Sequence, residues 1–479
     1  MVGAGFSGIG VTVRLKQAGL DDLVVYERST SVGGVWRDNT YPGAACDVPS
    51  HLYSFSFAPE GRWSNRFAQQ HEIVAYLERV AVEFDVVRHV RFSSEVESAV
   101  YDESCLVWTL RLADGTTGEY DVVITACGQL SRPAVPDVPG LQEFAGAVFH
   151  SAQWDHDADL SGRVAVLGTG ASAIQFVPEV ARQAAAMTVF QRSAPYVVRK
   201  PDRAYGPGTK AALERFPLLL KADRLRTFVT NEARSLGFNT EPRLMKGHQI
   251  RFSRQLSRSV PEPDLRARLT PSDPIGCKRI LQSNDWYPAL RQPHVRLVTE
   301  GVTAVEQTGV RTIDGELHVA DVLVLGTGFT ATELIAPMEV VGRGGRTLRE
   351  AWAGGAEAHL GTLVNGFPNL FLLYGPNTNL GHNSIVLMLE SQFRYVLDAL
   401  DQLAPGTAVE VRDDVQRAFN DDLQRRLGGT VFAGGCRSWY LTADGRNTQN
   451  WPGTTVEFRL RTRRVRPSDV VVHRLQASA

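Results

Sequence analysis

The chain has 479 residues, a formal net charge of -1, 43% hydrophobic residues and 22% charged residues. Its length predicts about three domains, or two large ones with an insertion, and its composition supplies enough apolar side chains for sizeable cores. The balanced charge gives no reason to expect nucleic acid or an anionic membrane as a partner, and no apolar run is long enough to span a membrane.

The cysteines are scattered along the chain and odd in number. They are Cys46, Cys105, Cys127, Cys277 and Cys436. None of them forms a Cys-x-x-Cys motif, so we expect no disulfide scaffold, no zinc site and no dithiol redox centre. The N-terminus shows no basic stretch followed by an apolar core, so we expect no secretory signal. Together these features predict a soluble protein of a reducing compartment, the cytoplasm, with no protein partner.

A glycine-rich turn opens the chain, with Gly3, Gly5 and Gly8 at the spacing G-x-G-x-x-G. The apolar run after it predicts a helix over 9–15, and the run over 23–27 predicts a buried strand ending in an acid. Such a turn lets a pyrophosphate approach the helix N-terminus, and an acid about 20 residues later binds the ribose. The predicted dinucleotide contacts are Gly3, Gly5, Phe6, Ser7, Gly8 and Glu27.

One element of this first unit is short. Only Met1 and Val2 precede the first glycine, whereas such a turn normally follows a central strand of about five residues. We interpret Val2 as the end of a strand whose beginning is absent from the sequence. A chain shortened in this way is expected to bind its dinucleotide weakly or to be unstable.

A second glycine-rich turn has Gly168, Gly170 and Ala173 at the same spacing. Where an NAD site carries an acid, this chain has Arg192 and Ser193, a cation and a hydroxyl that suit the 2′-phosphate of NADP. The alternative for Arg192 is an ordinary solvated surface charge. The predicted NADP contacts of this unit are Gly168, Thr169, Gly170, Ser172, Arg192 and Ser193.

The remaining pattern alternates strands and helices. Buried strands are predicted over 121–126, 163–167, 187–190, 295–298 and 322–325, and a helix is predicted over 384–403. Residues 203–270 are rich in Arg, Lys and Leu at helical spacing and predict a helical insertion. The predicted fold class is α/β, with two Rossmann-like dinucleotide-binding domains, for FAD and NADP, and this insertion.

The two dinucleotide units indicate a chain that passes electrons from NADPH to FAD. The order of the turns assigns FAD to the first unit. The predicted division is an FAD-binding domain over 1–143 and 318–479, the latter with C-terminal loops, an NADP-binding domain over 144–202 and 271–317, and the helical insertion over 203–270.

A further motif lies between the two glycine-rich turns. Phe144, Gly146, His150, Trp154 and Asp155 have the spacing Phe-x-Gly-x-x-x-His-x-x-x-Trp-Asp, and this segment resembles the fingerprint of type I Baeyer–Villiger monooxygenases. A histidine on a linker between two domains can respond to their rotation and so couple nicotinamide position to the flavin.

The resemblance extends over nearly the whole chain and implies a function. Members convert a ketone to an ester or lactone with FAD, NADPH and O2, through a C4a-peroxyflavin. By this resemblance Arg279 stabilises the negative charge, Asp47 orients Arg279, and Lys278 binds the NADP phosphate. The remaining residues carried over are Gly34, Val35, Trp36, Tyr41 and Asp47 near FAD, and Trp439, on a mobile segment Ser438-Trp439-Tyr440, over NADP. Ala45 departs from the pattern, since many members carry Arg there.

Several alternatives stay open on the sequence. Asp47 and Arg279 could form a structural salt bridge or be unrelated surface charges. The chain could be a flavin monooxygenase that oxygenates N or S atoms, or a flavin-binding protein without turnover. A pyridine-nucleotide disulfide reductase is disfavoured because no cysteine pair is evident. No histidines have metal-ligand spacing, so no metal site is predicted.

Overall fold

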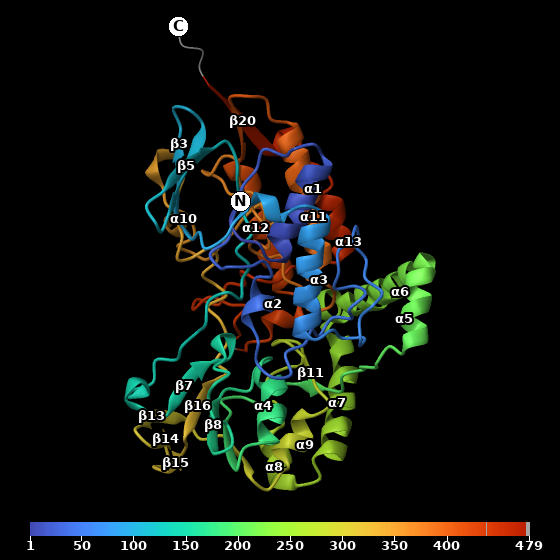
Figure 1. The fold of residues 1–479 in the computed structure, drawn as a ribbon, viewed down its shortest axis with the longest axis vertical. Coiled ribbons are helices and arrows are strands. Elements are labelled where there is room, and N and C mark those ends of the chain that lie inside the picture. Colours follow the sequence, from blue (N-terminus) through green and yellow to red (C-terminus); the bar gives the residue numbers. More distant parts are fainter. Residues whose placement is uncertain (437, 476–479) are drawn as a thin grey trace.

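Two α/β halves lie one above the other along the long axis of the molecule (Figure 1). The computed structural model describes residues 1–436 and 438–475. The two ends of the chain build the upper half in Figure 1, and the middle of the chain builds the lower half. Among the described residues, no helix combines the length and the apolar character needed to cross a membrane.

The lower half contains a parallel sheet of five strands in the order β12-β9-β8-β16-β7. Its strands are β7 (Ala147–His150), β8 (Arg163–Leu167), β9 (Ala186–Phe190), β12 (Val295–Val298) and β16 (Val322–Leu325). Helices α4 (Ala173–Ala181) and α9 (Trp286–Leu290) pack with them into one apolar core. The four strands predicted in this half are therefore confirmed.

The upper half repeats this strand order. The parallel neighbours are β2 (Val90–Arg91), β1 (Val25–Tyr26), Val2, β6 (Val123–Thr125) and β18 (Leu370–Leu372). Val2 donates to the Ile124 carbonyl at 3.0 Å and accepts from the Ala126 N–H at 2.7 Å. It thus takes the place that β8 has in the lower sheet, directly before a glycine-rich turn, as predicted for the end of a central strand. The predicted duplication of one nucleotide-binding unit is confirmed.

Each half also carries an antiparallel meander beside its parallel sheet. In the upper half it comprises β3 (Val96–Asp102), β4 (Val107–Leu112), β5 (Thr117–Tyr120) and β17 (Glu339–Val341), which pairs parallel to β3. In the lower half it comprises β13 (Val302–Glu306), β14 (Gly309–Thr312) and β15 (Leu317–Val319).

Three helices cover the upper parallel sheet (Figure 1). They are α1 (Phe6–Gln17), α3 (Gln70–Glu83) and α11 (Ile385–Asp401). α1 and α11 approach so closely that a Cβ on Gly10 would lie 2.5 Å from the Phe393 ring. Both predicted helices, over 9–15 and 384–403, are therefore confirmed.

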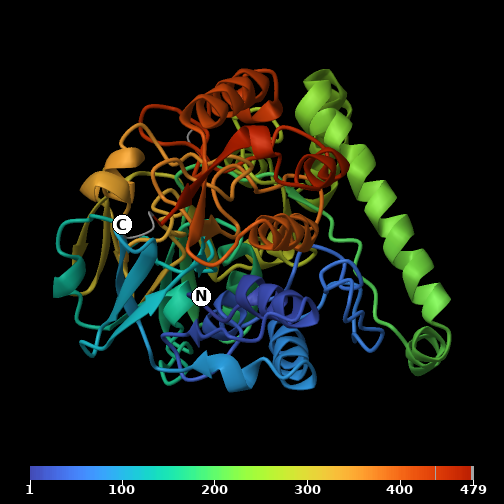
Figure 2. The same ribbon diagram turned by 90° about the horizontal axis from the view of Figure 1, so that it is seen from above.

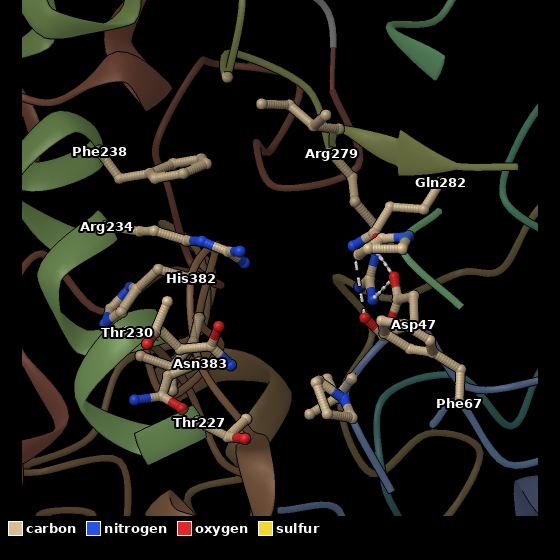
Figure 3. A pocket seen from close by; sticks show the side chains of 18 of the residues that line it. Asp47, Phe67, Thr227, Thr230, Arg234, Phe238, Arg279, Gln282, His382 and Asn383 are labelled. Carbon is tan, nitrogen blue, oxygen red and sulfur yellow. Dashed lines mark hydrogen bonds and ion pairs between the residues drawn. The ribbon is translucent and has the colours of Figure 1, made fainter. Parts of the chain in front are cut away.

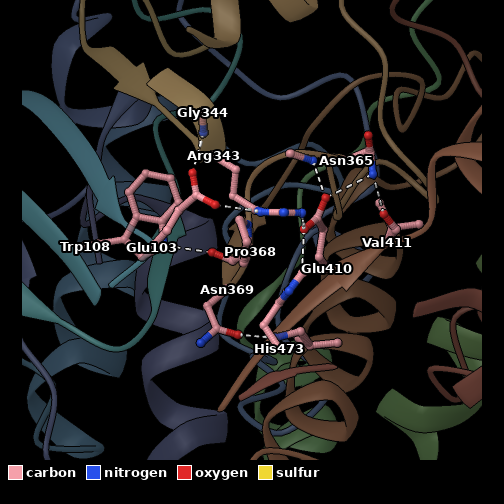
Figure 4. A network of polar contacts seen from close by, with 12 residues as sticks. Glu103, Trp108, Arg343, Gly344, Asn365, Pro368, Asn369, Glu410, Val411 and His473 are labelled. Atoms are coloured by element: carbon pink, nitrogen blue, oxygen red, sulfur yellow. Dashed lines mark hydrogen bonds and ion pairs between the residues drawn. The ribbon is translucent and has the colours of Figure 1, made fainter. Parts of the chain in front are cut away.

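A buried carboxylate anchors the segment that leads into β18. Glu410, on β19 (Thr407–Val411), is 4% exposed and accepts hydrogen bonds from the Asn365 side chain and the Gly366 N–H, at 3.0 and 2.7 Å. Arg343 donates to it at 2.9 Å, and His473, on β20 (Val470–Arg474), lies 2.7 Å away (Figure 4). A carboxylate with this many partners can remain charged while it is buried. It therefore fixes β19 and β20 against the segment that leads into β18.

The helical insertion lies along one side of the molecule, with α5 and α6 where the two halves meet and α7 and α8 beside the lower half (Figure 1). It comprises α5 (Pro207–Arg215), α6 (Pro217–Ser235), α7 (Met245–Ser259) and α8 (Pro263–Arg268), with a π-helical turn over Leu236–Thr240. In Figure 2, α6 runs along an edge of the molecule as one long helix. The helical character predicted for 203–270 is therefore confirmed. The remaining elements are α2 (Val35–Asp38), α10 (Leu348–Ala351), α12 (Asp413–Leu427), α13 (Thr455–Arg461), β10 (Val197–Val198) and β11 (Leu281–Gln282).

The expectation that the cysteines form no pair is wrong. Cys277 and Cys436 form a disulfide with a Cα–Cα distance of 6.2 Å, across 159 positions of sequence. Folding brings the loop before β11 against the loop after α12, a proximity that cysteine spacing cannot reveal. Cys46, Cys105 and Cys127 are free.

Candidate active site

The first glycine-rich turn forms a cradle at the start of α1. A Cβ on Gly8 would lie 1.9 Å from the Gly3 carbonyl oxygen, so only glycine allows the helix to begin this close to the turn. Gly5 is the N-cap of α1, and a Cβ on it would lie 3.5 Å from the Gly34 Cα. Two backbone segments without side chains thus face each other at a helix N-terminus, which fits the pyrophosphate of a dinucleotide.

Glu27 closes this cradle on one side. It is 5% exposed and accepts from the Ala4 N–H at 2.8 Å and the Ser29 N–H at 3.0 Å. The carboxylate therefore lies at the end of β1 beside the turn, where an acid can bind a ribose hydroxyl. Phe6 and Ser7, predicted as dinucleotide contacts, lie in the first turn of α1, which begins three residues earlier than predicted.

The loop after α2 connects the upper half to the lower half. The Tyr41 hydroxyl donates to Gln175 Oε1, on α4, at 2.9 Å, and Gln175 Nε2 donates to the Ala45 carbonyl at 2.9 Å. One glutamine of the second dinucleotide unit thus binds the loop that carries Asp47. Trp36, on α2, donates to the Tyr53 hydroxyl at 3.0 Å, which fixes the other end of this loop.

The second glycine-rich turn has the same kind of cradle. Gly168 has φ +109°, and a Cβ on it would lie 2.3 Å from the Gly326 carbonyl oxygen, whereas a Cβ on Gly170 would meet open space. Gly170 therefore leaves room for a phosphate near α4. Thr169 lies against this turn, its hydroxyl 3.4 Å from the Ser193 carbonyl oxygen.

Two predicted NADP contacts meet beside this turn, and a third, Arg192, is next to one of them in the sequence. Lys278 Nζ donates to Ser193 Oγ at 3.1 Å and forms a salt bridge with Asp273 at 2.6 Å. Arg192 is exposed next to Ser193. The structure thus brings together Ser193 and Lys278, which are 85 positions apart, as a site with cations and a hydroxyl suited to a phosphate monoester.

Asp47 and Arg279 form the central pair of the site. Arg279 Nη2 and Nε donate to Asp47 Oδ2 at 2.5 and 3.0 Å. Burial alone would raise the pKa of Asp47, but the positive charge and hydrogen bonds of Arg279 outweigh burial and lower it. The negative charge of Asp47 in turn raises the pKa of Arg279, so both groups are charged. The pair consists of a carboxylate from the upper half and a guanidinium from the lower half.

This pair lines a pocket of about 830 Å³, its mouth included, between the two halves and the helical insertion (Figure 3). Arg279 and Asp47 keep 37% and 26% of their side chains accessible because they face this open volume. Lys278 and Tyr440 also line the pocket, and burial raises the pKa of Tyr440 to about 12. The pocket thus presents a guanidinium and a carboxylate to a molecule that enters between the two halves.

The motif between the glycine-rich turns lies outside the pocket lining. His150 ends β7 and is 3% exposed; its Nδ1 accepts from the Ala152 N–H at 3.1 Å, so the neutral ring carries its proton on Nε2. Burial lowers the pKa of His150. Trp154 packs edge-on against Phe149 and close to Phe176, with ring centroids 5.1 and 5.2 Å apart. These contacts make the motif part of the core beneath the second glycine-rich turn.

Trp439 does not line the pocket itself, but its ring lies 4.5 Å from that of Tyr440, which does. A polar wall on the opposite side of the pocket, formed by α6, is a feature that was not predicted from the sequence. The residues of this wall are Thr227, Thr230, Asn231 and Arg234. Their helical spacing was a usable signal, although a polar face on a helix normally indicates contact with solvent.

Comparisons with known proteins agree with this geometry. The family model for flavin-binding monooxygenase-like proteins matches residues 1–235. A Baeyer–Villiger monooxygenase of Streptomyces coelicolor is 47% identical over 97% of this chain and 90% of its own length. The structure of an oxidised steroid monooxygenase bound to NADP superposes with a TM-score of 0.85 at 33% identity, over 96% of each chain. The structure of OTEMO in complex with FAD and NADP gives 0.85 at 27% identity, also over 96% of each chain.

Two Rossmann-like domains, a helical insertion and a guanidinium–carboxylate pair between the cradles define a flavin- and NADPH-dependent monooxygenase. Its cofactors are FAD and NADPH. Within that class the chain belongs to the type I Baeyer–Villiger monooxygenases, enzymes that oxygenate ketones. The resemblance found in the sequence is confirmed, and the alternatives of a nitrogen- or sulfur-oxygenating enzyme and of a protein without turnover are not supported.

Proposed function

We propose that Arg279 is the catalytic residue of this monooxygenase and that Asp47 positions it. The observation that supports this is the doubly hydrogen-bonded pair in the pocket, with one partner from each half. Bound FAD, reduced by NADPH, supplies the activation of O2. The Arg279 guanidinium contacts the carbonyl oxygen of the ketone and stabilises the negative charge that develops there as the ester or lactone forms.

The charge of Arg279 is what makes this role possible. A guanidinium stays protonated at every working pH, so it does not lose a proton to the basic oxygen atoms around it. Asp47 prevents the guanidinium from turning away and offsets the cost of holding a cation at the edge of the core. We further propose that Tyr440 and Tyr374, whose pKa values burial raises to about 12, remain neutral beside the pair.

The two cradles hold the cofactors in this proposal. FAD binds the first turn, Glu27 and the loop from Gly34 to Asp47; NADP binds the second turn, with its 2′-phosphate on Arg192, Ser193 and Lys278. Trp439 covers the NADP from the side of Tyr440. We propose the domain division given above, 1–143 with 318–479 and 144–202 with 271–317, with one change. β16 (Val322–Leu325) pairs with β7 and β8 of the lower sheet, so the second part of the FAD-binding domain begins after β16 and not at residue 318.

The motif around His150 is proposed to transmit movement between the halves. His150 ends a strand of the lower sheet and packs edge-on against Phe329, on the segment that returns to the upper half, with ring centroids 5.8 Å apart. Its buried Nε2 has no hydrogen-bond partner among the described residues, so a small rotation could supply one.

The substrates are O2 and a small-molecule ketone. We propose the cytoplasm as the compartment, because the enzyme consumes NADPH and depends on the supply of NADPH in the cytoplasm. Disulfides are rare in that compartment, so the Cys277–Cys436 bond is an exception. Burial protects its sulfur atoms from reductants in solution, since Cys277 and Cys436 are 0% and 5% exposed.

The test is turnover of a panel of ketones by the purified, flavin-loaded protein. NADPH oxidation should depend on the ketone, and mass spectrometry should identify a product heavier than the substrate by one oxygen atom that comes from 18O2. If amines or sulfides, but no ketone, stimulate NADPH oxidation and are themselves oxygenated, the proposal is wrong.

A further inference from the structure

The wall of the pocket opposite Arg279 is a polar face of one helix. Thr227, Thr230, Asn231 and Arg234 stand at positions i, i+3, i+4 and i+7 of α6, and this spacing places them on one side of the helix. All four line the pocket. In Figure 3 the Arg234 side chain extends from α6 toward the open volume, across which Asp47 and Arg279 lie.

Arg234 carries a charge that the protein does not neutralise. The Arg234 side chain is exposed toward the open volume, yet partial burial of its guanidinium lowers the pKa, and the second cause is the positive charge of Arg66, which also lines the pocket. Within the described residues neither of these arginines forms a salt bridge, whereas Arg279 across the pocket has Asp47. The neighbouring acid Glu232 accepts hydrogen bonds from Asn383, Thr455 and Val456 instead.

A buried amide stands beside these cations. Asn231 is 5% exposed and lines the pocket, one helical turn before Arg234. No described residue forms a hydrogen bond with its side chain, so its amide atoms are open to the pocket. Two unpaired guanidinium groups and a free amide donor together constitute a site for an oxyanion, because each can donate to carboxylate oxygens.

We propose that the substrate is a ketone that carries an anionic oxyacid group, in the simplest case a keto carboxylate. This inference rests on the proposed function: the carbonyl lies at Arg279, and the carboxylate lies at Arg234, Arg66 and Asn231. The anion accepts a hydrogen bond from the Asn231 amide and relieves the repulsion between Arg234 and Arg66, and an uncharged ketone cannot relieve that repulsion.

The test compares methyl-ketone carboxylic acids of increasing chain length with their methyl esters, which have the same carbonyl and no charge. Acids long enough to reach across the pocket should have a higher kcat/KM than their esters. Arg234→Gln should reduce the acid-to-ester ratio of kcat/KM about 10- to 100-fold, mainly through KM for the acid, as expected for one charge-assisted hydrogen bond. Arg234→Lys should retain part of the preference, because the charge remains.

Binding is measured separately, by titration of the oxidised, NADP+-loaded enzyme with the acid and with the ester. Arg226→Gln is the matched control, since Arg226 lies on the same helix and is exposed, as Arg234 is, but does not line the pocket. It should leave the acid-to-ester ratio within about twofold, because a surface charge outside the pocket contributes little to binding of the acid.

The possible failures are distinguishable. Equal affinities and equal kcat/KM for acid and ester would overturn this inference and leave the proposed function intact. An unchanged ratio in Arg234→Gln with a raised KM for NADPH would show that Arg234 binds the cofactor, which also overturns it. Tight binding of the acid with no turnover of any ketone would instead contradict the proposed function.

Discussion

Asp47 and Arg279 stand 232 positions apart in the chain, and two hydrogen bonds to one carboxylate oxygen, of 2.5 and 3.0 Å, join them inside the pocket. Asp47 belongs to the loop that Gln175 binds, and Arg279 follows the loop of Lys278. The pair therefore depends on the relative position of both dinucleotide units. Catalysis and cofactor binding are linked through the same short segments.

Removal of the guanidinium should separate NADPH oxidation from oxygen transfer. In Arg279→Ala we expect continued oxidation of NADPH, release of hydrogen peroxide and a fall in ester formation of about 100-fold or more, because no donor stabilises the charge on the carbonyl oxygen. The measurement is the molar ratio of ester and peroxide to NADPH consumed. Oxygenation at the wild-type rate would remove Arg279 from the mechanism.

The partner variant Asp47→Asn tests positioning with the cation retained. We expect an intermediate fraction of peroxide, since the guanidinium is still present but is held by a neutral amide. The fraction of NADPH consumption that ends as hydrogen peroxide should depend on ketone concentration more strongly in Asp47→Asn than in Arg279→Ala. Identical behaviour of the two variants would mean that Asp47 does more than orient Arg279.

The cation beside Ser193 should determine the choice of nicotinamide cofactor. Lys278 Nζ lies 3.1 Å from Ser193 Oγ, at the place proposed for the 2′-phosphate. Lys278→Ala should raise KM for NADPH about 10- to 100-fold and change KM for NADH little, because NADH has no phosphate there. Steady-state kinetics with both cofactors measures this. Equal increases in KM for NADPH and for NADH would mean that Lys278 contacts a part of the nucleotide that both cofactors share.

Local sequence signals predicted the parts of the fold that are local in the chain. The glycine-rich turns, the apolar strands around them and the helices of the insertion each arise within about 20 residues, so spacing and periodicity indicate them. The cofactor preference was also open to prediction, because Arg192 and Ser193 follow directly after a strand of the second unit.

Contacts across the fold were predictable only in part. The roles of Asp47 and Arg279 came from resemblance, since nothing in their spacing distinguishes them from two surface charges. The bond between Cys277 and Cys436 was missed for the same reason, as 159 positions separate them. The polar face with Arg234 was present in the sequence, but only the packing of α6 determines that it borders a pocket and not solvent.

Glu232 predicts an acid-dependent contribution to stability. Burial alone would raise its pKa, but the nearby His382, 3.7 Å away, and hydrogen bonds from Thr455, the Val456 N–H and Asn383 outweigh burial and lower the pKa from 4.5 to about 2. A lowered pKa means stabilisation that is complete above pH 4.5 and is lost as the pH falls toward 2. Glu232→Gln should therefore destabilise the protein by up to about 3 kcal/mol at pH 7.

This difference between wild type and Glu232→Gln should shrink steadily below about pH 4.5. Urea unfolding at several pH values between 7 and 3, followed by tryptophan fluorescence, measures it. The matched control is Glu179→Gln, a half-buried acid on α4 that forms a salt bridge with Arg182. A difference that stays constant across this range would show that Glu232 acts through packing and not through its charge.

The Cys277–Cys436 bond joins the segment of Lys278 and Arg279 to the segment of Ser438 and Tyr440. Protein unfolded without reductant should therefore show three thiols, and five after reduction, because only Cys46, Cys105 and Cys127 are free.

Closing a loop across 159 positions stabilises the fold by about 5 kcal/mol in the chain-entropy description. Cys436→Ser should lower the thermal midpoint and raise KM for NADPH, since Lys278 loses its neighbouring anchor. Cys105→Ser, at an exposed free cysteine, should do neither. Five reactive thiols in the unreduced, unfolded wild type would show that the bond does not form.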